Sequence, residues 1–243
     1  MKTKKLILNM TLAIAAFSML TLTSCDKRIR KNGSGVITTS TRDLGEFSDV
    51  DIDGSYDLYI HESSEQKVTI TTDDNLMSEV HTFVQDGKLN ISMSDDYYNY
   101  KYTKMEIHVY NNAFSRIDLN GSVNVTAPDT IHGQNLVCSH NGSGNCSLKF
   151  TGDELQLDIN GSANIQAGGD VDDLHVEING SGKIDALDVI SVNGVAKIHG
   201  SGDIYVNCSS TLDAWISGSG NIRYIGGPTV TSHIDGSGSI APY

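Results

Sequence analysis

The sequence predicts an all-β protein, a right-handed parallel β-helix or β-solenoid with a decorated N-terminal β-region. Two observations lead to this fold class. A Gly-Ser motif recurs seven times at intervals of 18 to 21 residues, and the residues between these motifs alternate between apolar and polar, as in strands. The composition agrees, because 24 glycines and a low content of helix-forming residues indicate many short strands.

The regular repeat begins near residue 119. Its leading glycines are Gly121, Gly142, Gly161, Gly180, Gly200, Gly218 and Gly236. Within one unit, from Leu155 to Ala167, residues of one parity are apolar and those of the other are polar. Because this parity continues through Gly-Ser-Gly, we expect the tripeptide to form an extended corner whose inward positions have no room for a side chain.

Equivalent strands of successive units are expected to pair in parallel, because each is reached only after a full circuit of similar length. Nearly all such crossovers are right-handed, which gives the predicted hand. This arrangement stacks Ile159 on Ile178 and Ile165 on Ile184, and continues both ladders through the later units. The alternative is an antiparallel sandwich with Asn-Gly hairpin turns, which explains the period and the parity less well.

Residues 1–24 have the features of a lipoprotein signal peptide. Three lysines precede the apolar stretch Leu6 to Leu22, and the segment ends in Leu-Thr-Ser-Cys, which resembles the lipobox of bacterial lipoproteins. We expect Cys25 to be acylated and to anchor the chain durably in a membrane through several acyl chains. An ordinary secretory signal with an incidental cysteine is the alternative.

The rest of the chain divides into three predicted regions. Residues 25–42 are expected to be the lipidated cysteine and a polar tether. Residues 43–118 form an N-terminal β-region that caps the stack, and residues 119–243 form the Gly-Ser-Gly solenoid. Within the cap, the sequence predicts strands at Lys67 to Thr72, Lys88 to Met93 and Met105 to Tyr110, and a helical turn at Asn75 to Val80.

Charge and cysteine content narrow the possible partners. The formal net charge of -13 argues against nucleic acid and anionic lipid surfaces as partners.

Three cysteines follow the signal segment, and an odd number cannot form a closed disulfide framework. Cys138 and Cys146 could pair across a turn, but their inward parity favours buried free thiols. Together with His140 they match no zinc spacing, so we expect no metal and no other cofactor.

Three features resemble a known family. The Gly-Ser-Gly ladder, the opening Phe47 to Gly54 and the segment Asp86 to Ile91 are similar to the GIN domain, described as an autotransporter adhesin head and common in lipoproteins of Bacteroidota. The resemblance covers about residues 45 to 240. It implies a β-helical fold and a role in adhesion, and it brings no catalytic residues. The weaker copies at His140 and Val192 depart from the pattern and predict local irregularity.

The outward parity predicts a candidate binding surface along the corners. Its residues are Asn160, Ser162, Asn164, Asn179 and Ser181, with Lys197, Trp215 and His233 in a neighbouring column. Such a surface would suit a glycan or another protein, and an exposed indole can stack on a sugar ring. The alternatives are that the ladders only satisfy the turn backbone and one another, and that the C-terminal segment covers the indole.

The sequence therefore predicts a non-enzymatic, adhesin-like binding module. We expect it to be lipid-anchored in the cell envelope, at the outer membrane. The sequence does not decide between the periplasmic and the surface face of that membrane. Its ligand would be a glycan or an envelope protein. A structural scaffold module is the alternative. A polysaccharide lyase is a third and weaker one, because few basic residues follow residue 110 and no long loop separates the repeats.

Overall fold

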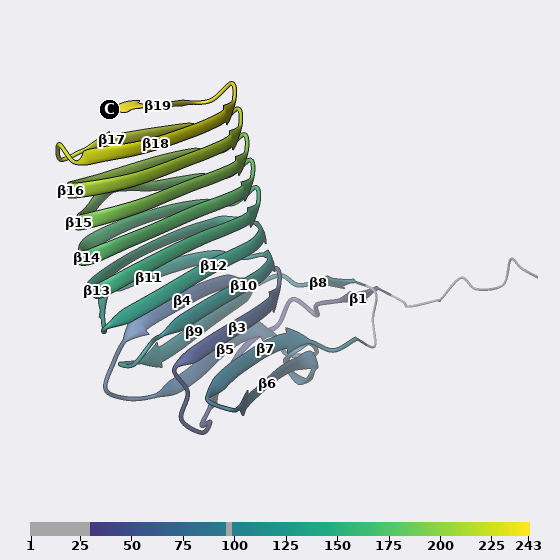
Figure 1. The fold of residues 1–243 in the computed structure, drawn as a ribbon. Helices are drawn as coiled ribbons and strands as arrows, with labels where there is room; N and C mark the ends of the chain where they lie inside the picture. Colours follow the sequence, from purple (N-terminus) through teal and green to yellow (C-terminus); the bar gives the residue numbers. More distant parts are fainter. Residues whose placement is uncertain (1–29, 96–98) are drawn as a thin grey trace, which may run out of the picture. The chain divides into compact units, whose positions relative to one another are not determined.

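The computed structural model describes residues 30–95 and 99–243 (Figure 1). The chain divides into two compact units. In the smaller one, Lys31 of β1 (Lys31–Asn32) lies in a two-stranded sheet with β8 (Tyr100–Lys101). The signal segment and Cys25 lie outside the described residues. Within those residues, no helix has the length and apolar character needed to cross a membrane.

The larger unit is a β-solenoid built from two faces, sheet A and sheet B. Sheet A consists of β6 (Val80–Gln85), β7 (Lys88–Met93), β3 (Asp49–Gly54), β10 (Arg116–Ser122), β12 (Asn135–Ser143), the second halves of β13 (Asn145–Gly161), β14 (Asn164–Gly180), β15 (Lys183–Gly200) and β16 (Asp203–Gly218), and β18 (Thr229–Gly236). Sheet B consists of β2 (Ile37–Arg42), β5 (Lys67–Asp73), β9 (Met105–Asn111), β4 (Asp57–Glu62), β11 (Asn124–His132), the first halves of β13 to β16, β17 (Asn221–Ile225) and β19 (Ser239–Pro242).

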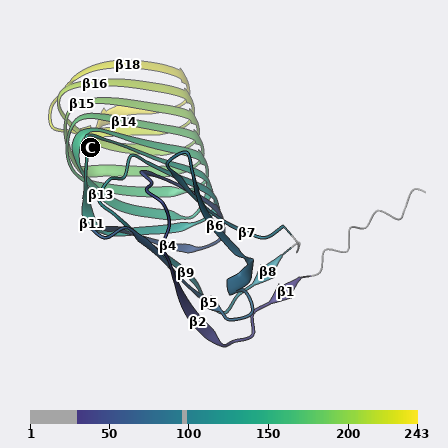
Figure 2. The same ribbon diagram turned by 90° about the horizontal axis from the view of Figure 1, so that it is seen from below.

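The winding agrees with the predicted fold class. In Figure 1 the strands of sheet A run in front toward the corners and those of sheet B return behind them, while the chain climbs toward its C-terminus, so the coil is right-handed. Viewed from below, each turn forms a loop (Figure 2). The antiparallel sandwich is excluded, because every strand pair from β10 onward is parallel.

Two inner ladders form the core, in the predicted register. Ile159 pairs with Ile178 and Ile165 pairs with Ile184, and the later isoleucines continue both columns. These four side chains are at most 1% exposed. Burial of such stacked aliphatic side chains, at roughly 25 cal/mol per Å² of apolar surface, is the main stabilising contribution of each turn.

The corner glycines are required for two different reasons. Gly180 has a φ of +143°, and a Cβ there would lie 2.2 Å from the carbonyl oxygen of Gly161 in the preceding corner. The obstacle is therefore neighbouring backbone rather than the core. A Cβ on Gly182 would lie 2.4 Å from the carbonyl oxygen of Ala163 and 2.9 Å from the side chain of Ile159. Only this second glycine occupies the crowded inward position that the parity predicts.

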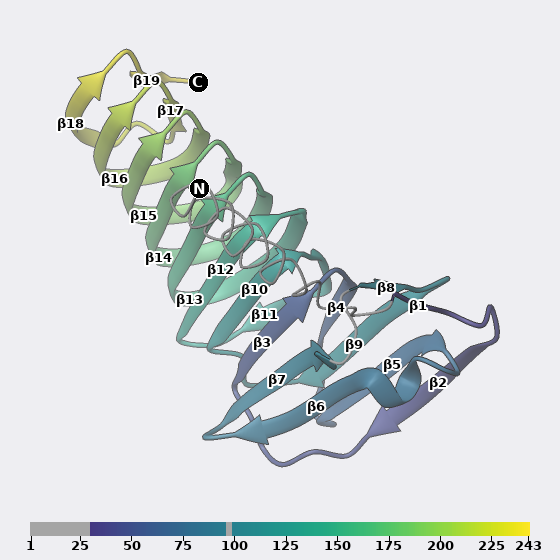
Figure 3. The same cartoon turned by 90° about the vertical axis from the view of Figure 1, so that its right-hand side faces the viewer.

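The N-terminal strands close one end of the stack. β5 pairs antiparallel with β9 and with β2, and β6 pairs antiparallel with β7. The three strands predicted within residues 43–118 are present, and a short 3-10 helix, η1 (Met77–Glu79), lies within the predicted helical turn. Figure 3 shows these strands at one end of the stack and β18 and β19 at the other.

The structure corrects the predicted tether. Residues 37–42 form β2, an edge strand of sheet B, instead of an unstructured linker. The run Ile-Thr-Thr-Ser-Thr-Arg is rich in β-branched residues, which favour strands even where both faces are polar. An edge strand tolerates this polarity because water can reach its side chains and the backbone groups of its unpaired edge.

Two further segments depart from regular geometry. The polar stretch 168–173 remains within β14, so the chain turns there without leaving its ladder. The pairing of β15 with β16 shifts register between Ala186 and Asn193, and the side chain of Val192 is exposed. This confirms the irregularity predicted for the Val192 copy.

The last two strands of the stack are paired on one side. Among the residues that the structure describes, β18 pairs with β16 alone and β19 pairs with β17 alone. Most of β18 is exposed, and Ile234, the last member of the first inner ladder, is 43% exposed.

Candidate functional site

The corner ridge, defined as Asn160, Ser162, Asn164, Asn179 and Ser181, is exposed at every position. The backbone amides at its corners are satisfied by backbone hydrogen bonds. The amide of Ser162 donates to the carbonyl oxygen of Gly142 at 2.9 Å, and the same bond recurs in the next corner between Ser181 and Gly161. These serine and asparagine side chains are therefore not needed to satisfy the corner backbone.

The first amide ladder runs along the end of sheet A and comprises Asn120, Asn141, Asn160 and Asn179. It begins where Asn120 Nδ2 donates to Asp51 Oδ1 at 2.9 Å. Each later Nδ2 donates to the Oδ1 of the preceding turn, at 3.0 Å for Asn141, 2.8 Å for Asn160 and 3.1 Å for Asn179. The next turn carries His199 at this position, so the ladder ends there.

The second amide ladder runs along the start of sheet B. Asn124 Nδ2 donates to Asp57 Oδ1 at 3.1 Å, and Asn145 and Asn164 each donate to the preceding Oδ1, at 3.4 and 3.2 Å. The next residue in the column is Lys183. Two parallel rows of amides therefore border the serine corners.

The ladders leave hydrogen-bonding capacity exposed. A side-chain amide has two N–H donors and an oxygen with two lone pairs, and its place in the row uses one donor and one lone pair. The remaining donors and acceptors therefore recur along each ladder at the strand spacing of about 4.8 Å, from Asn141 to Asn160 in the first and from Asn145 to Asn164 in the second. A polyhydroxylated ligand can bind such a periodic and uncharged row.

Acidic residues line the column beside the first ladder. Asp118, Asp158 and Glu177 occupy it on three turns. Burial raises the pKa of Asp158, the hydrogen bond from Gln156 at 2.8 Å lowers it, and the neighbouring Glu177 raises it again. Asp118 is paired with Lys88 at 3.7 Å and with Arg116 at 3.4 Å, so the remaining negative charge of this column lies on Asp158 and Glu177, where it disfavours an anionic ligand at the ridge.

Trp215, Lys197 and His233 share one column on successive turns, as the sequence predicts. The indole is 42% exposed, its Nε1 donates to Asp213 Oδ1 at 2.7 Å, and its ring centroid lies 4.9 Å from that of His233. The column of Trp215 continues that of Glu177, so the indole lies two turns beyond Asn179. These residues form a separate patch that adjoins the ridge only through Lys197.

An aromatic stack on sheet B was missed by the sequence reasoning. The ring of Tyr59 lies 4.6 Å from that of His108, and the ring of His61 lies 4.4 Å from that of Tyr110. Burial, and then the neighbouring His61, lower the pKa of His108. The available signal was outward parity in the two strands β4 and β9, but their pairing joins residues nearly 50 positions apart.

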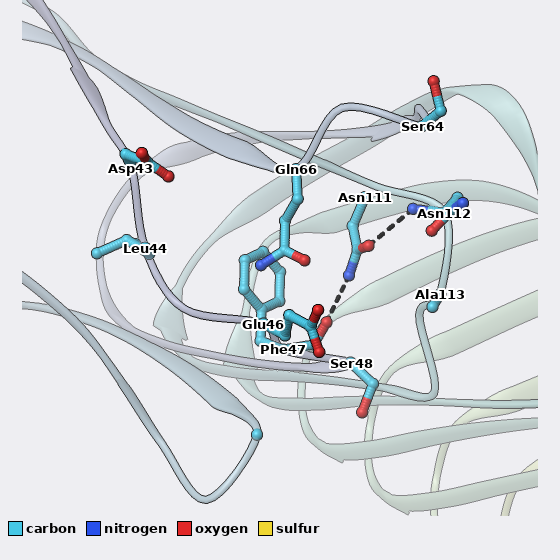
Figure 4. Close-up of a pocket in the computed structure, with 11 residues that line it drawn as sticks. Asp43, Leu44, Glu46, Phe47, Ser48, Ser64, Gln66, Asn111, Asn112 and Ala113 are labelled. Atoms are coloured by element: carbon cyan, nitrogen blue, oxygen red, sulfur yellow. Dashed lines mark hydrogen bonds between the residues drawn. The ribbon is translucent and has the colours of Figure 1, made fainter.

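A pocket of about 720 Å³ lies between the segment 43–48 and nearby turns of the cap (Figure 4). Two side-chain amides point into it, but both hold the segment in place. Gln66 Nε2 donates to the carbonyl oxygen of Gly45 at 2.8 Å, and Asn111 Nδ2 donates to that of Phe47 at 2.6 Å. Because these donors are committed, the pocket is a weaker candidate than the ridge.

The weak copy around His140 has a structural explanation. His140 takes the place of a ladder isoleucine, and its Nε2 donates to the carbonyl oxygen of Val123 at 2.9 Å. In the next corner the backbone amide of Asn164 donates to the carbonyl oxygen of Gly144, but the backbone amide of Asn145 donates to the side-chain Oδ1 of Asn124 at 3.2 Å. The imidazole therefore supplies the hydrogen bond that the carbonyl oxygen of Val123 lacks from the backbone. Burial lowers the pKa of His140.

The three cysteines of the described residues are buried and free, as predicted. The Sγ atoms of Cys138 and Cys146 lie 3.8 Å apart. The hydrogen bond to Cys146 and burial raise the pKa of Cys138, which keeps its thiol protonated. This cluster packs in the core and presents no group to a ligand.

Comparisons with known proteins agree with this architecture. Residues 46–228 match the family described as "Putative auto-transporter adhesin, head GIN domain". A putative adhesin from Bacteroides fragilis has 24% sequence identity and a TM-score of 0.84, covering 87% of this chain and 99% of its own. A putative lipid binding protein from Parabacteroides distasonis has 27% identity and a TM-score of 0.76, covering 88% and 100%. No curated protein matches the chain. The match over residues 46–228 shows that this chain belongs to the family of GIN head domains of auto-transporter adhesins.

Proposed function

We propose that this protein is a lipid-anchored, non-catalytic adhesin of the bacterial cell envelope whose corner ridge binds a neutral glycan. Its family supports adhesion, and the lipobox-like segment ending at Cys25 supports anchoring. The outer membrane is the proposed location, because a surface-exposed adhesin must be held there.

The amide ladders are the observation on which this proposal depends. Asn160 and Asn179 are exposed, uncharged and aligned on adjacent turns, while the corner backbone is already satisfied by backbone hydrogen bonds. Because these side chains do not have to satisfy the backbone of the corner, their remaining hydrogen-bonding groups are available to an external ligand. Both N–H donors of Asn179 are used, by Asn160 Oδ1 and Glu177 Oε1. A sugar hydroxyl can accept from the free N–H of Asn160 and can donate to the free oxygen lone pairs of both amides.

The charge around the ridge decides between ligand classes. The acidic side chains of Asp158 and Glu177 disfavour uronic polysaccharides, and with them a lyase reaction on such chains. The Parabacteroides distasonis relative carries the name of a lipid binding protein. The ridge offers amides and hydroxyls instead of an apolar cavity, so a glycan suits it better than an acyl chain.

The test is glycan-array binding with the double variant Asn160→Ala and Asn179→Ala. Each lost hydrogen bond is worth about 0.5 to 1.5 kcal/mol, so the double variant should bind roughly 5- to 150-fold more weakly. Asn193→Ala is the matched control. Its amide donates to Asp173 Oδ1 at 3.0 Å on the same sheet but at the opposite end of the strand.

Thermal melting separates a binding role from a structural one. The proposal predicts weaker glycan binding by the double variant, a melting temperature close to that of Asn193→Ala, and unchanged glycan affinity for the control. Unchanged affinity together with a lowered melting temperature would reduce the ladder to a structural element. A protein partner captured in place of any glycan would favour the scaffold alternative.

A further inference from the structure

A second polar surface lies on the outer face of sheet B, beyond the second amide ladder. It is a groove of about 560 Å³ that crosses β11, β13 and β14 and ends at β15. The second amide ladder forms one side of this groove. Thr126, Ser147 and Gln166 form its floor, one residue on each of three adjacent turns.

The floor differs from the ladder in its hydrogen bonding. The Asn side chains of the ladder bond to one another, whereas Thr126, Ser147 and Gln166 make no side-chain hydrogen bond to any other residue that the structure describes. Two hydroxyls and one amide therefore face outward in a row with their full donor and acceptor capacity free.

An aromatic ring lies one strand beyond the residues that line one end of the groove. Tyr59 lies beside Thr126 in the register of β4 and β11. The opposite face of the Tyr59 ring is stacked on His108, with ring planes 11° apart. Because Thr126 is small, the face of Tyr59 toward the groove has no comparable ring against it. This is the geometry in which an aromatic ring can stack on the apolar face of a sugar.

The other end is closed by charges that neutralise each other. Lys183 Nζ donates to Asp185 Oδ2 at 3.0 Å and lies 4.6 Å from the ring centroid of Tyr205. A paired cation and anion leave little net field to attract an ionic ligand. The groove therefore suits an uncharged molecule.

We propose that this groove is a second glycan subsite, which takes a short neutral oligosaccharide lying across the strands with one sugar ring on Tyr59. The distance from the turn of Tyr59 to that of Gln166 is three strand spacings, about 15 Å, which is long enough for several sugar units. The subsite rests on the proposed glycan-binding function, and it extends the ridge through the shared second ladder.

The experiment measures binding of a panel of neutral hexose and N-acetylhexosamine oligosaccharides by wild type and three variants. Tyr59→Ala removes the stacking face, and Thr126→Trp places an indole against that face without removing Tyr59. Tyr110→Ala is the matched control, because it removes another ring of the same stack that lies on β9, one strand further from the groove than Tyr59. Thermal melting of each variant verifies folding.

The subsite predicts that Tyr59→Ala and Thr126→Trp each weaken binding by about tenfold or more, and that Tyr110→Ala binds as wild type does. If wild type binds a glycan that the ridge variant of Asn160 and Asn179 loses, while both groove variants retain full affinity, the groove is overturned and the ridge stands. Absence of binding by wild type across the panel overturns both proposals.

Discussion

Replacement of Gly180 by alanine tests the physical basis of the corner. The φ of this residue is +143°, a region that residues with a side chain rarely adopt, and the added Cβ would lie 2.2 Å from the carbonyl oxygen of Gly161. Neither problem can be relieved by a rotamer change. The obstacle is a backbone carbonyl oxygen that is held in place because it accepts from the backbone amide of Ser181 at 2.9 Å.

The cost follows from two contributions. A sparsely populated backbone conformation costs about 1 to 3 kcal/mol, and overpacking costs about 1 to 3 kcal/mol, so we expect a loss of roughly 2 to 6 kcal/mol. Gly227→Ala isolates the first contribution, because its φ is +77° and its Cβ would meet nothing within 4 Å. Gly45→Ala carries neither penalty, since its Cβ would also be unobstructed and its φ is not in that region.

Urea unfolding of the three variants measures these differences as shifts of the transition midpoint. The expected order of stability is Gly45→Ala, then Gly227→Ala, then Gly180→Ala. For a chain of this size, each kcal/mol lowers the melting temperature by about 2 to 4 °C, so Gly180→Ala should melt roughly 4 to 24 °C below wild type. A midpoint for Gly180→Ala equal to that of Gly45→Ala would refute the close approach of successive corners.

Three further outcomes are expected. Burial lowers the pKa of His140, so the unfolded chain binds its proton more readily; stability should fall as the pH drops below about 6.5, and His140→Leu should flatten the urea midpoint across that window. Burial alone would raise the pKa of Asp73, but backbone hydrogen bonds from Thr103 and Gly35 hold it below the usual value. The resulting stability is present above about pH 3.9 and is lost below it, so Asp73→Asn should lower the midpoint at pH 7 and reduce this acid dependence. Finally, Cys25→Ser should move the protein from the membrane pellet to the soluble fraction, and continued sedimentation with membranes would contradict acylation at this residue.

The repeat could be predicted to the residue because its signals are local. Period and parity recur in every turn, so the pairing of Ile159 with Ile178 followed from spacing alone. The amide rows were predictable for the same reason, since a position that repeats in sequence must repeat along the stack. The sequence did not reveal that backbone hydrogen bonds satisfy the corners beneath Ser162 and Ser181, because that depends on the close approach of successive turns.

The cap and the groove depend on contacts that no local spacing encodes. Tyr59 and His108 meet because β4 and β9 pair in parallel although four strands lie between them in the chain. The strand β2 pairs antiparallel with β5, 30 residues further along the chain, so its polar run looked like a tether. His140 takes the place of a ladder isoleucine, and its bond to Val123 arises from one irregular corner, which no local spacing encodes.

The strands β18 and β19, each paired on one side in the described structure, give the molecule a direction of growth. In a stack of turns each unit interacts mainly with its neighbours, so one more Gly-Ser-Gly turn placed after Ile240 would find a ready template and would disturb none of the earlier registers. The antiparallel strands at the other end admit no such addition. Addition of turns at this end can therefore lengthen the fold, and fraying should also begin there, because Ile234 has a ladder neighbour on one side in the described structure.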